Sequence, residues 1–138
     1  MAKMHYINKN KLGEKFVPKG IHSDNTDIVR LLKQDFLENN DKYKVVGFFR
    51  KSPGHYFLFL TIMDHIIEHK SIKFETILRA IPDKFGSRSK IFQIFKEAVE
   101  EEYLVKRKNF EDGREQIYYP SDFFVDQCNK WLNIFNCK

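Results

Sequence analysis

One short stretch of the chain has the residue types of a metalloenzyme site. Residues 65–69 read His-Ile-Ile-Glu-His, the H-x-x-E-H pattern in which two histidines one helical turn apart hold zinc and the glutamate activates water. An enzyme would also need a third ligand and a cleft, and only the acidic run at residues 100–102 offers a ligand. The same letters arise if His65, Glu68 and His69 form the polar stripe of an otherwise apolar helix. We therefore expect no catalytic residue, no bound metal and no cofactor, although stoichiometric zinc would favour the enzyme.

The cysteines indicate a reducing environment. Cys128 and Cys137 lie late in the chain, with no CxxC or Cys/His spacing that would predict a disulfide framework or a structural zinc site. Cys128 falls on the apolar face of a predicted helix and is expected in the core, whereas Cys137 is expected at a frayed end. The longest apolar run, residues 56–63, is far below the roughly 18 residues that span a bilayer. We expect a cytoplasmic protein without a membrane partner.

Charge is informative through its position more than its total. The 138 residues carry 24 Lys+Arg against 19 Asp+Glu, a formal net charge of +5. Lysine outnumbers arginine 18 to 6, which fits an AT-rich codon bias, so the net charge alone is weak evidence for a nucleic-acid partner. The positive residues gather in residues 1–22, 42–51 and 84–96, and the last group is followed at once by the acidic run.

The amino-terminal part of the chain predicts an arm and a first helix. Residues 1–22 show no sustained period, so we expect a flexible basic arm, followed by a single domain over residues 23–138. Ser23 or Asp24 can cap an amphipathic helix over about residues 24–39. Residues 43–49 (YKVVGFF) are rich in β-formers but contain Gly47, which predicts a strand or an extended connector.

The middle of the chain predicts three helices in succession. Ser52 and Pro53 begin a helix that runs to about Lys70 and is apolar over most of its circumference, so it belongs at the centre of the domain. After an extended link, residues 74–81 form a short helix that Pro82 stops, and residues 83–86 form a turn. Ser87 then caps a helix to about residue 102, with Phe92 or Ile94 at the margin of its apolar face.

The remaining segments complete a recognisable order of elements. Residues 104–110 and 114–119 are β-leaning and joined through Asp112-Gly113, a strong hairpin signal. Ser121 caps a last helix over about residues 122–135. Across residues 53–120 the order is that of a winged helix-turn-helix. We therefore predict an α+β, mainly α fold with a three-helix core, a β-hairpin wing and extra amino- and carboxy-terminal helices.

Three segments within residues 53–120 resemble one family. Residues 85–91, their continuation over 96–107, and residues 111–114 resemble the recognition helix and wing of MarR-like bacterial transcription regulators, although Tyr103 stands where that family usually has glycine. The resemblance implies a sequence-specific regulator that binds double-stranded DNA. It also implies a homodimer formed through the terminal helices on a pseudo-palindromic site, with a small-molecule effector that no residue here identifies.

The candidate DNA contacts also follow from the chemistry of the residues. A recognition helix presents its amino-terminal turns to the major groove, where Arg and Gln read bases and Lys more often neutralises phosphates. The candidates are Ser87, Arg88, Ser89, Lys90, Gln93 and Lys96 on the recognition helix, and Lys106, Arg107, Lys108 and Arg114 on the wing.

Other interpretations stay open at this stage. The charged helix end can simply be solvated, with lysine-rich strands that reflect codon bias. A plasmid or phage replication-initiation winged helix would bind an origin instead of a promoter. In a protein-interaction winged helix without DNA binding, Arg88, Lys90 and Arg114 would be dispensable.

Overall fold

The computed structural model describes residues 20–108 and 116–136 of the chain, which divides after Lys33 into two compact units. In the first unit the described elements are the 3-10 turn η1 (Ser23–Asn25) and the first part of helix α2 (Thr26–Lys42). The second unit, Gln34–Lys138, contains the rest of α2 and all the later elements. The predicted arm lies almost wholly outside the described residues, so its flexibility stays a prediction, as does the single domain over residues 23–138.

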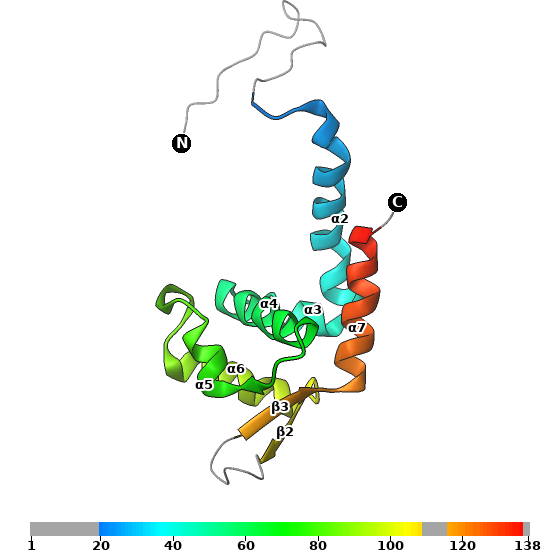
Figure 1. The fold of residues 1–138 in the computed structure, drawn as a ribbon. Coiled ribbons are helices and arrows are strands. Elements are labelled where there is room, and N and C mark those ends of the chain that lie inside the picture. The colour runs from blue at the N-terminus through cyan, green and yellow to red at the C-terminus, as the bar shows by residue number, and fades with distance from the viewer. Residues whose placement is uncertain (1–19, 109–115, 137–138) are drawn as a thin grey trace, which may run out of the picture. The chain divides into compact units, whose positions relative to one another are not determined.

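The second unit has the predicted winged helix-turn-helix order (Figure 1). Its elements are α4 (Pro53–Ile67), β1 (Ile72–Lys73), α5 (Phe74–Arg79), the 3-10 turn η2 (Asp83–Phe85), α6 (Arg88–Glu100), β2 (Leu104–Lys108) and β3 (Gln116–Pro120). The strands form one antiparallel sheet in the order β1-β3-β2, in which Tyr118 lies opposite both Ile72 and Lys106. The mainly helical α+β fold with a three-helix core and a β-hairpin is thereby confirmed.

Three serines begin the helices that the sequence predicts them to begin. The hydroxyl oxygens of Ser52, Ser87 and Ser121 accept hydrogen bonds from the backbone N–H groups three residues later, at 3.1, 3.2 and 3.1 Å. Each bond satisfies an N–H that has no partner inside its helix, which stabilises the helix start by about 1 kcal/mol. The beginnings of α4, α6 and α7 (Asp122–Asn133) are therefore fixed locally.

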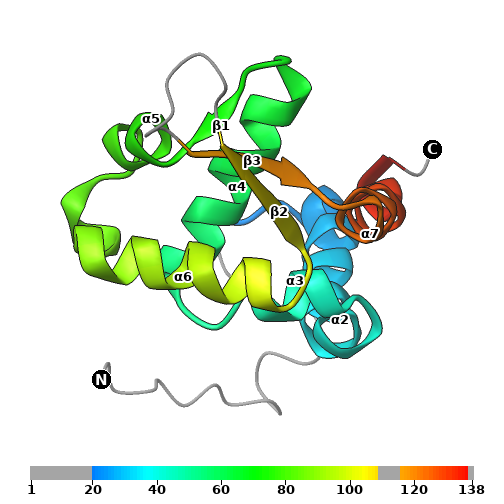
Figure 2. The ribbon, with the colours of Figure 1, turned by 90° about the horizontal axis from the view of Figure 1, so that it is seen from below.

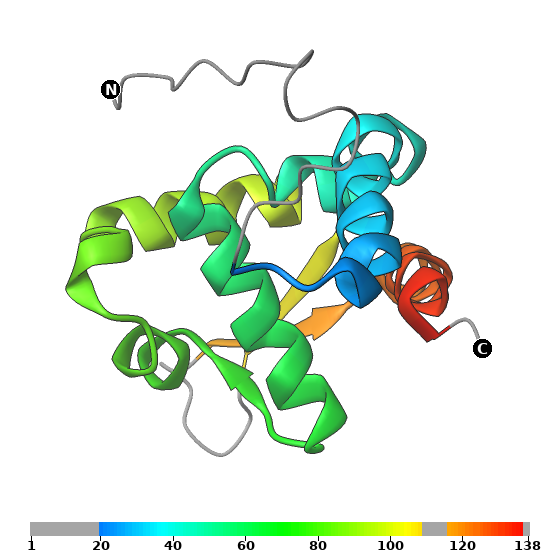
Figure 3. The ribbon, with the colours of Figure 1, turned by 90° about the horizontal axis from the view of Figure 1, so that it is seen from above.

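Helix α4 lies at the centre of the second unit, as its apolar circumference predicts. Leu58, Phe59 and Ile62 are fully buried, and Figure 3 shows α5 and α6 on one side of α4 and α7 on the other. The ring of Phe59 stacks on Phe49, with centroids 4.8 Å apart, and meets Phe124 of α7 edge-on at 5.8 Å. Aromatic packing thus makes α7 part of the winged-helix core.

The prediction of a strand or extended connector over residues 43–49 is wrong. This segment forms helix α3 (Lys44–Phe48), whose Val45 and Val46 are fully buried. Burial of these β-branched side chains outweighs their modest intrinsic preference for strands. Gly47 has a packing role, because a Cβ there would lie 2.2 Å from the carbonyl oxygen of Asn40 at the end of α2.

Several helix boundaries also differ from the predicted ones by a few residues. Helix α2 begins after η1, at Thr26, and runs on to Lys42. Helices α4 and α6 end earlier than predicted, and each is followed by a non-glycine residue with positive φ, His69 at 58° and Glu102 at 64°. Helix α7 ends at Asn133 and is followed by the 3-10 turn η3 (Ile134–Asn136).

Candidate nucleic-acid interface

The start of α6 is built from a glycine turn and a serine cap. Gly86 has φ 152°, and a Cβ at this position would lie 3.1 Å from Cγ of Lys90, so the turn requires glycine. Ser87 follows in extended conformation and caps the helix through Lys90. The backbone N–H groups of Arg88 and Ser89 have no acceptor within the helix and provide a positive helix end suited to phosphate.

The two sides of α6 are chemically distinct. Ile91, Ile94, Phe95 and Ala98 are buried, so of the two margin residues it is Ile94 that enters the core, while Phe92 is 49% exposed. Every predicted contact on this helix is exposed: Arg88, Ser89, Lys90, Gln93 and Lys96. Ser87 is exposed as well. The buried side fixes the helix to the unit while its polar side faces solvent.

Arg88 is held by the preceding helix. Its Nη1 donates to Oε1 of Glu75 on α5 at 3.0 Å, and Nη2 donates to Oε2 of the same carboxylate. The hydrogen bond to Arg88 lowers the pKa of Glu75 below its ordinary value. The guanidinium also lies over the ring of Phe74, 5.2 Å from its centroid. Because both charged groups are more than half exposed, the pair stabilises the fold little and can be exchanged for another anion or a base.

Gln93 and the two lysines predicted to contact phosphate are held less firmly than Arg88. The side-chain amide of Gln93 donates to Glu97 Oε2 at a long 3.4 Å. Lys90 and Lys96 are exposed on the same helix. The acidic run begins at the carboxyl end of α6, on the opposite end from the exposed N–H groups.

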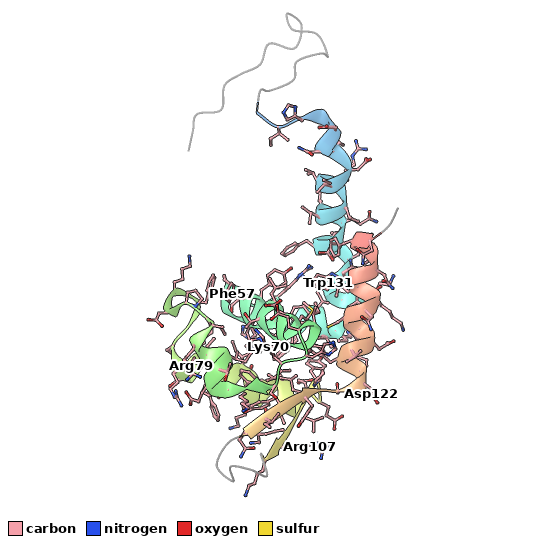
Figure 4. The ribbon with its side chains drawn as sticks, in the orientation of Figure 1. Phe57, Lys70, Arg79, Arg107, Asp122 and Trp131 are labelled. Atoms are coloured by element: carbon pink, nitrogen blue, oxygen red, sulfur yellow. The ribbon has the colours of Figure 1, made fainter. Side chains whose placement is uncertain are left out.

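The hairpin carries a second group of exposed cations. Lys106, Arg107 and Lys108 are exposed along β2, whereas Leu104 at its start is buried. Helix α6 contacts β2, and Figure 2 shows β2 close to the carboxyl end of the helix. Figure 4 marks Arg107 on the outer part of the hairpin. The fourth predicted wing contact, Arg114, lies outside the described residues.

The histidine pattern does not form the geometry of a zinc peptidase. Helix α4 ends at Ile67, so Glu68 is its C-cap and His69 follows in the left-handed region. The two histidines therefore do not lie one turn apart on a helix. The ring Nδ1 of His65 lies 3.0 Å from the carbonyl oxygen of Thr61, and Glu68 pairs with Lys70 at 2.9 Å. No group of three or more His, Cys, Asp or Glu residues among the described residues could hold a metal ion.

The sequence did not reveal a buried polar cluster around Arg50, a residue within the basic stretch 42–51. Arg50 Nη2 donates to Asp35 Oδ2 at 2.5 Å, with both side chains at most 4% exposed. Asn39 and Trp131 also donate to this carboxylate, at 2.8 and 2.7 Å. Burial alone would raise the pKa of Asp35, but the three hydrogen bonds outweigh it and hold the pKa below its ordinary value.

This cluster removes one cation from the surface that could meet DNA. The guanidinium of Arg50 lies over the rings of Phe36, Tyr56 and Trp131, at 4.6, 5.4 and 5.2 Å from their centroids. No periodicity signals such a site, because Asp35 looks like any polar position of an amphipathic helix. Arg50 is structural, and only Lys42, Lys44 and Lys51 of the basic stretch are exposed.

The described cysteine behaves as a core residue. Cys128 is 5% exposed on α7, and burial raises the pKa of its thiol to about 12. The thiol therefore stays protonated and unreactive near neutral pH. Cys137 lies outside the described residues. Within the described ranges, no helix combines the length and the apolar character needed to cross a bilayer.

Comparison with known proteins gives one distant structural likeness. No protein-family model matches the sequence, and no curated protein matches it. Among solved structures, the chain is similar to the adhesin competence repressor of Streptococcus pyogenes, with 13% sequence identity and a TM-score of 0.39 over 83% of this chain and 80% of that one. By its name that protein is a repressor. The winged-helix assignment follows from this chain's own element order and strand pairing.

Proposed function

We propose that this chain is a cytoplasmic, sequence-specific transcription regulator of winged-helix type, which reads double-stranded DNA with α6 and holds its backbone with the β2–β3 hairpin. The observation that carries the proposal is the exposed polar side of α6 together with the exposed cations of β2, on two elements that contact each other. In winged-helix proteins these two elements meet the same duplex. No catalytic step is part of this function.

The proposed contacts fall into two classes. Arg88 and Gln93 carry side chains that bind guanine and adenine through two hydrogen bonds, so they would read bases in the major groove. Lys90, Lys96 and the hairpin cations would neutralise phosphates, with Ser87, Ser89 and the free N–H groups of α6 adding backbone contacts. Arg114 would add a further contact to the DNA at the wing.

The terminal helices are the proposed dimer interface. Ile28, Val29 and Leu32 of α2 are each more than half exposed, and α7 exposes Phe123. Exposed apolar residues on both helices favour burial against a second copy of the chain. A two-fold dimer would place two α6 helices on a pseudo-palindromic site, with half-sites one helical turn apart or a multiple of it.

The salt dependence of binding to labelled genomic fragments tests this function. If the hairpin neutralises phosphates, the affinity falls linearly with log[salt], and each lost phosphate contact lowers the slope by about 0.9. Lys106→Ala should weaken all fragments alike and lower that slope by about one. Arg88→Ala should instead reduce the preference for the best fragment over random DNA, by about tenfold or more.

The controls separate the alternatives. Lys130→Ala changes an exposed lysine on α7 that pairs with Asp126 at 3.1 Å, and it should leave binding unchanged. If Arg88→Ala and Lys106→Ala also leave it unchanged, the groove assignment is wrong. If the unmodified protein binds no fragment, the protein-interaction function is favoured, and selection of origin fragments would favour replication initiation.

A further inference from the structure

An aromatic side chain lies exposed within the polar side of α6. Phe92 is 49% exposed and is the exposed large apolar side chain of this helix, every residue of which is described. Polar predicted contacts flank it in sequence, Ser89 one turn before and Lys96 one turn after. Exposure of an apolar ring to water is unfavourable. The proposed function gives Phe92 no role, because its contacts are hydrogen bonds to bases and ion pairs with phosphates.

Phe92 is supported from below by a series of rings. It meets Phe74 of α5 edge-on, with centroids 5.5 Å apart and ring planes at 87°. Phe74 meets the buried Phe95 at 5.6 Å, and Phe95 meets Tyr118 of the sheet at 4.6 Å. Because each ring rests on the next, the position of Phe92 is fixed by the core instead of being free to collapse onto the surface.

The two outer rings border an open hollow on the surface of α5 and α6. It has a volume of about 320 Å³ and is lined by Phe74, Arg88, Ser89 and Phe92. Arg88, held by Glu75 and lying over Phe74, forms its cationic rim. The hollow therefore combines an apolar floor with a polar edge at the first turns of α6, where a recognition helix meets base edges.

We propose that Phe74 and Phe92 form a seat for the 5-methyl group of a thymine in the major groove. The proposal deepens the proposed function. Among the four bases only thymine presents a methyl group in the major groove, and side chains such as phenylalanine contact it through apolar surface. A protein partner would need a larger apolar area, whereas this spot is bounded by Ser89, Lys96 and Arg88. Thymine selection would thus add to the hydrogen-bond readout by Arg88 and Gln93.

Removal of thymine methyl groups from the DNA tests the seat directly. The fragment that the full-length protein binds most tightly is amplified once with dTTP and once with dUTP, which deletes the methyl groups and keeps the base pairing. We expect the affinity of the unmodified protein for the uracil fragment to fall about fivefold for each buried methyl contact that is lost. Phe92→Ala should bind the thymine fragment about as weakly and no longer distinguish the two fragments.

Matched variants separate a methyl contact from other effects. Phe92→Leu keeps an apolar side chain and should keep part of the preference for thymine. Leu60→Ala removes another exposed apolar side chain, on α4, and should distinguish the fragments as the unmodified protein does. If Phe92→Ala impairs folding, as shown by a lowered melting temperature, Phe92→Gln replaces it and should likewise lose the preference.

The outcomes also distinguish the seat from the proposed function. Equal binding of both fragments by the unmodified protein overturns the seat and leaves DNA binding intact. A preference that persists in Phe92→Ala also overturns it, because the methyl groups would then act through DNA shape. If the unmodified protein binds neither fragment, the proposed function itself fails and the seat fails with it.

Discussion

Helix α7 and the part of α2 that follows Lys33 look alike in sequence but differ in what they bury. Helix α7 buries Phe124, Cys128 and Trp131 against the winged-helix core, as an amphipathic helix is expected to do. Helix α2 buries Asp35 and Asn39, while Phe36 and Leu37 are 64% and 75% exposed. Apolar periodicity therefore identifies the apolar face of a helix, but not whether that face meets the same chain.

Different forces attach the two helices. The contacts of α7 with Phe49 and Phe59 are apolar and non-directional, so they depend on buried area and close packing. The contacts of α2 around Asp35 are charged hydrogen bonds, which depend on geometry and on a matching partner. Buried ion pairs contribute little relative to a well-packed apolar cluster, but losing one partner leaves an unpaired charge in the interior. The two attachments should therefore fail in different ways.

The largest expected effect is the loss of a buried ring of α7. Phe124 is 1% exposed and meets Phe49 and Phe59 edge-on. Phe124→Ala should lower the free energy of unfolding by about 3–5 kcal/mol, as measured by urea denaturation, because it opens a cavity between α7 and α4. The neighbouring Phe123→Ala, at a 46% exposed position, should cost far less. Equal losses would contradict the packing of α7 into the core.

A smaller loss is expected when only the polar link between α7 and α2 is cut. Trp131→Phe removes the Nε1–H donor to Asp35 and keeps most of the apolar ring. The free energy of unfolding should fall by about 1.5–3 kcal/mol, the range for a hydrogen bond to a charged group. A double-mutant cycle with Asp35→Ala provides the measurement, and fully additive effects of the two changes would exclude the link.

Acid should weaken the polar cluster around Asp35 but not the apolar contacts of α7. The pKa of Asp35 is lower in the folded chain than in the unfolded chain, so the unfolded state binds the proton first. The stability that the carboxylate contributes is present above the unfolded pKa and is lost as the pH falls through the lowered pKa of the folded chain. Thermal unfolding between pH 5 and 2 should show this loss, and Asp35→Asn, less stable at neutral pH, should show a flatter profile. If the unmodified protein and Asp35→Asn lose stability in parallel as the pH falls, Asp35 is not the cause of the loss.

The smallest effect on folding is expected on the exposed face of α2. Leu37→Gln should change the free energy of unfolding by no more than about 0.5 kcal/mol, because the side chain is mostly in water already. If the proposed dimer uses this face, the same variant should lower the dimer fraction in sedimentation at micromolar concentration. Leu60→Gln, at a 41% exposed position of α4, is the matched control. A monomeric unmodified protein would contradict the dimer.

The candidate site was predictable to the extent that local signals define it. Ser87 at the start of α6 and the exposed positions after it follow from the cap and the apolar period, and the hairpin strands follow from their β-formers on either side of Asp112-Gly113. The ion pair between Glu75 and Arg88 and the exposure of Phe92 were not predictable. Both depend on the packing of α5 against α6, which brings together residues that share no local pattern.

The sequence by itself determined where most helices begin, which helix is central and the order that makes a winged helix, because caps, proline and apolar spacing act within a few residues. Only the tertiary structure decided that residues 43–49 are helical, that Arg50 is buried against Asp35, and that His69 leaves its helix. Those outcomes depend on how much apolar surface and charge each segment buries against residues distant in the sequence. The free energy of that burial cannot be read from any single stretch of the chain.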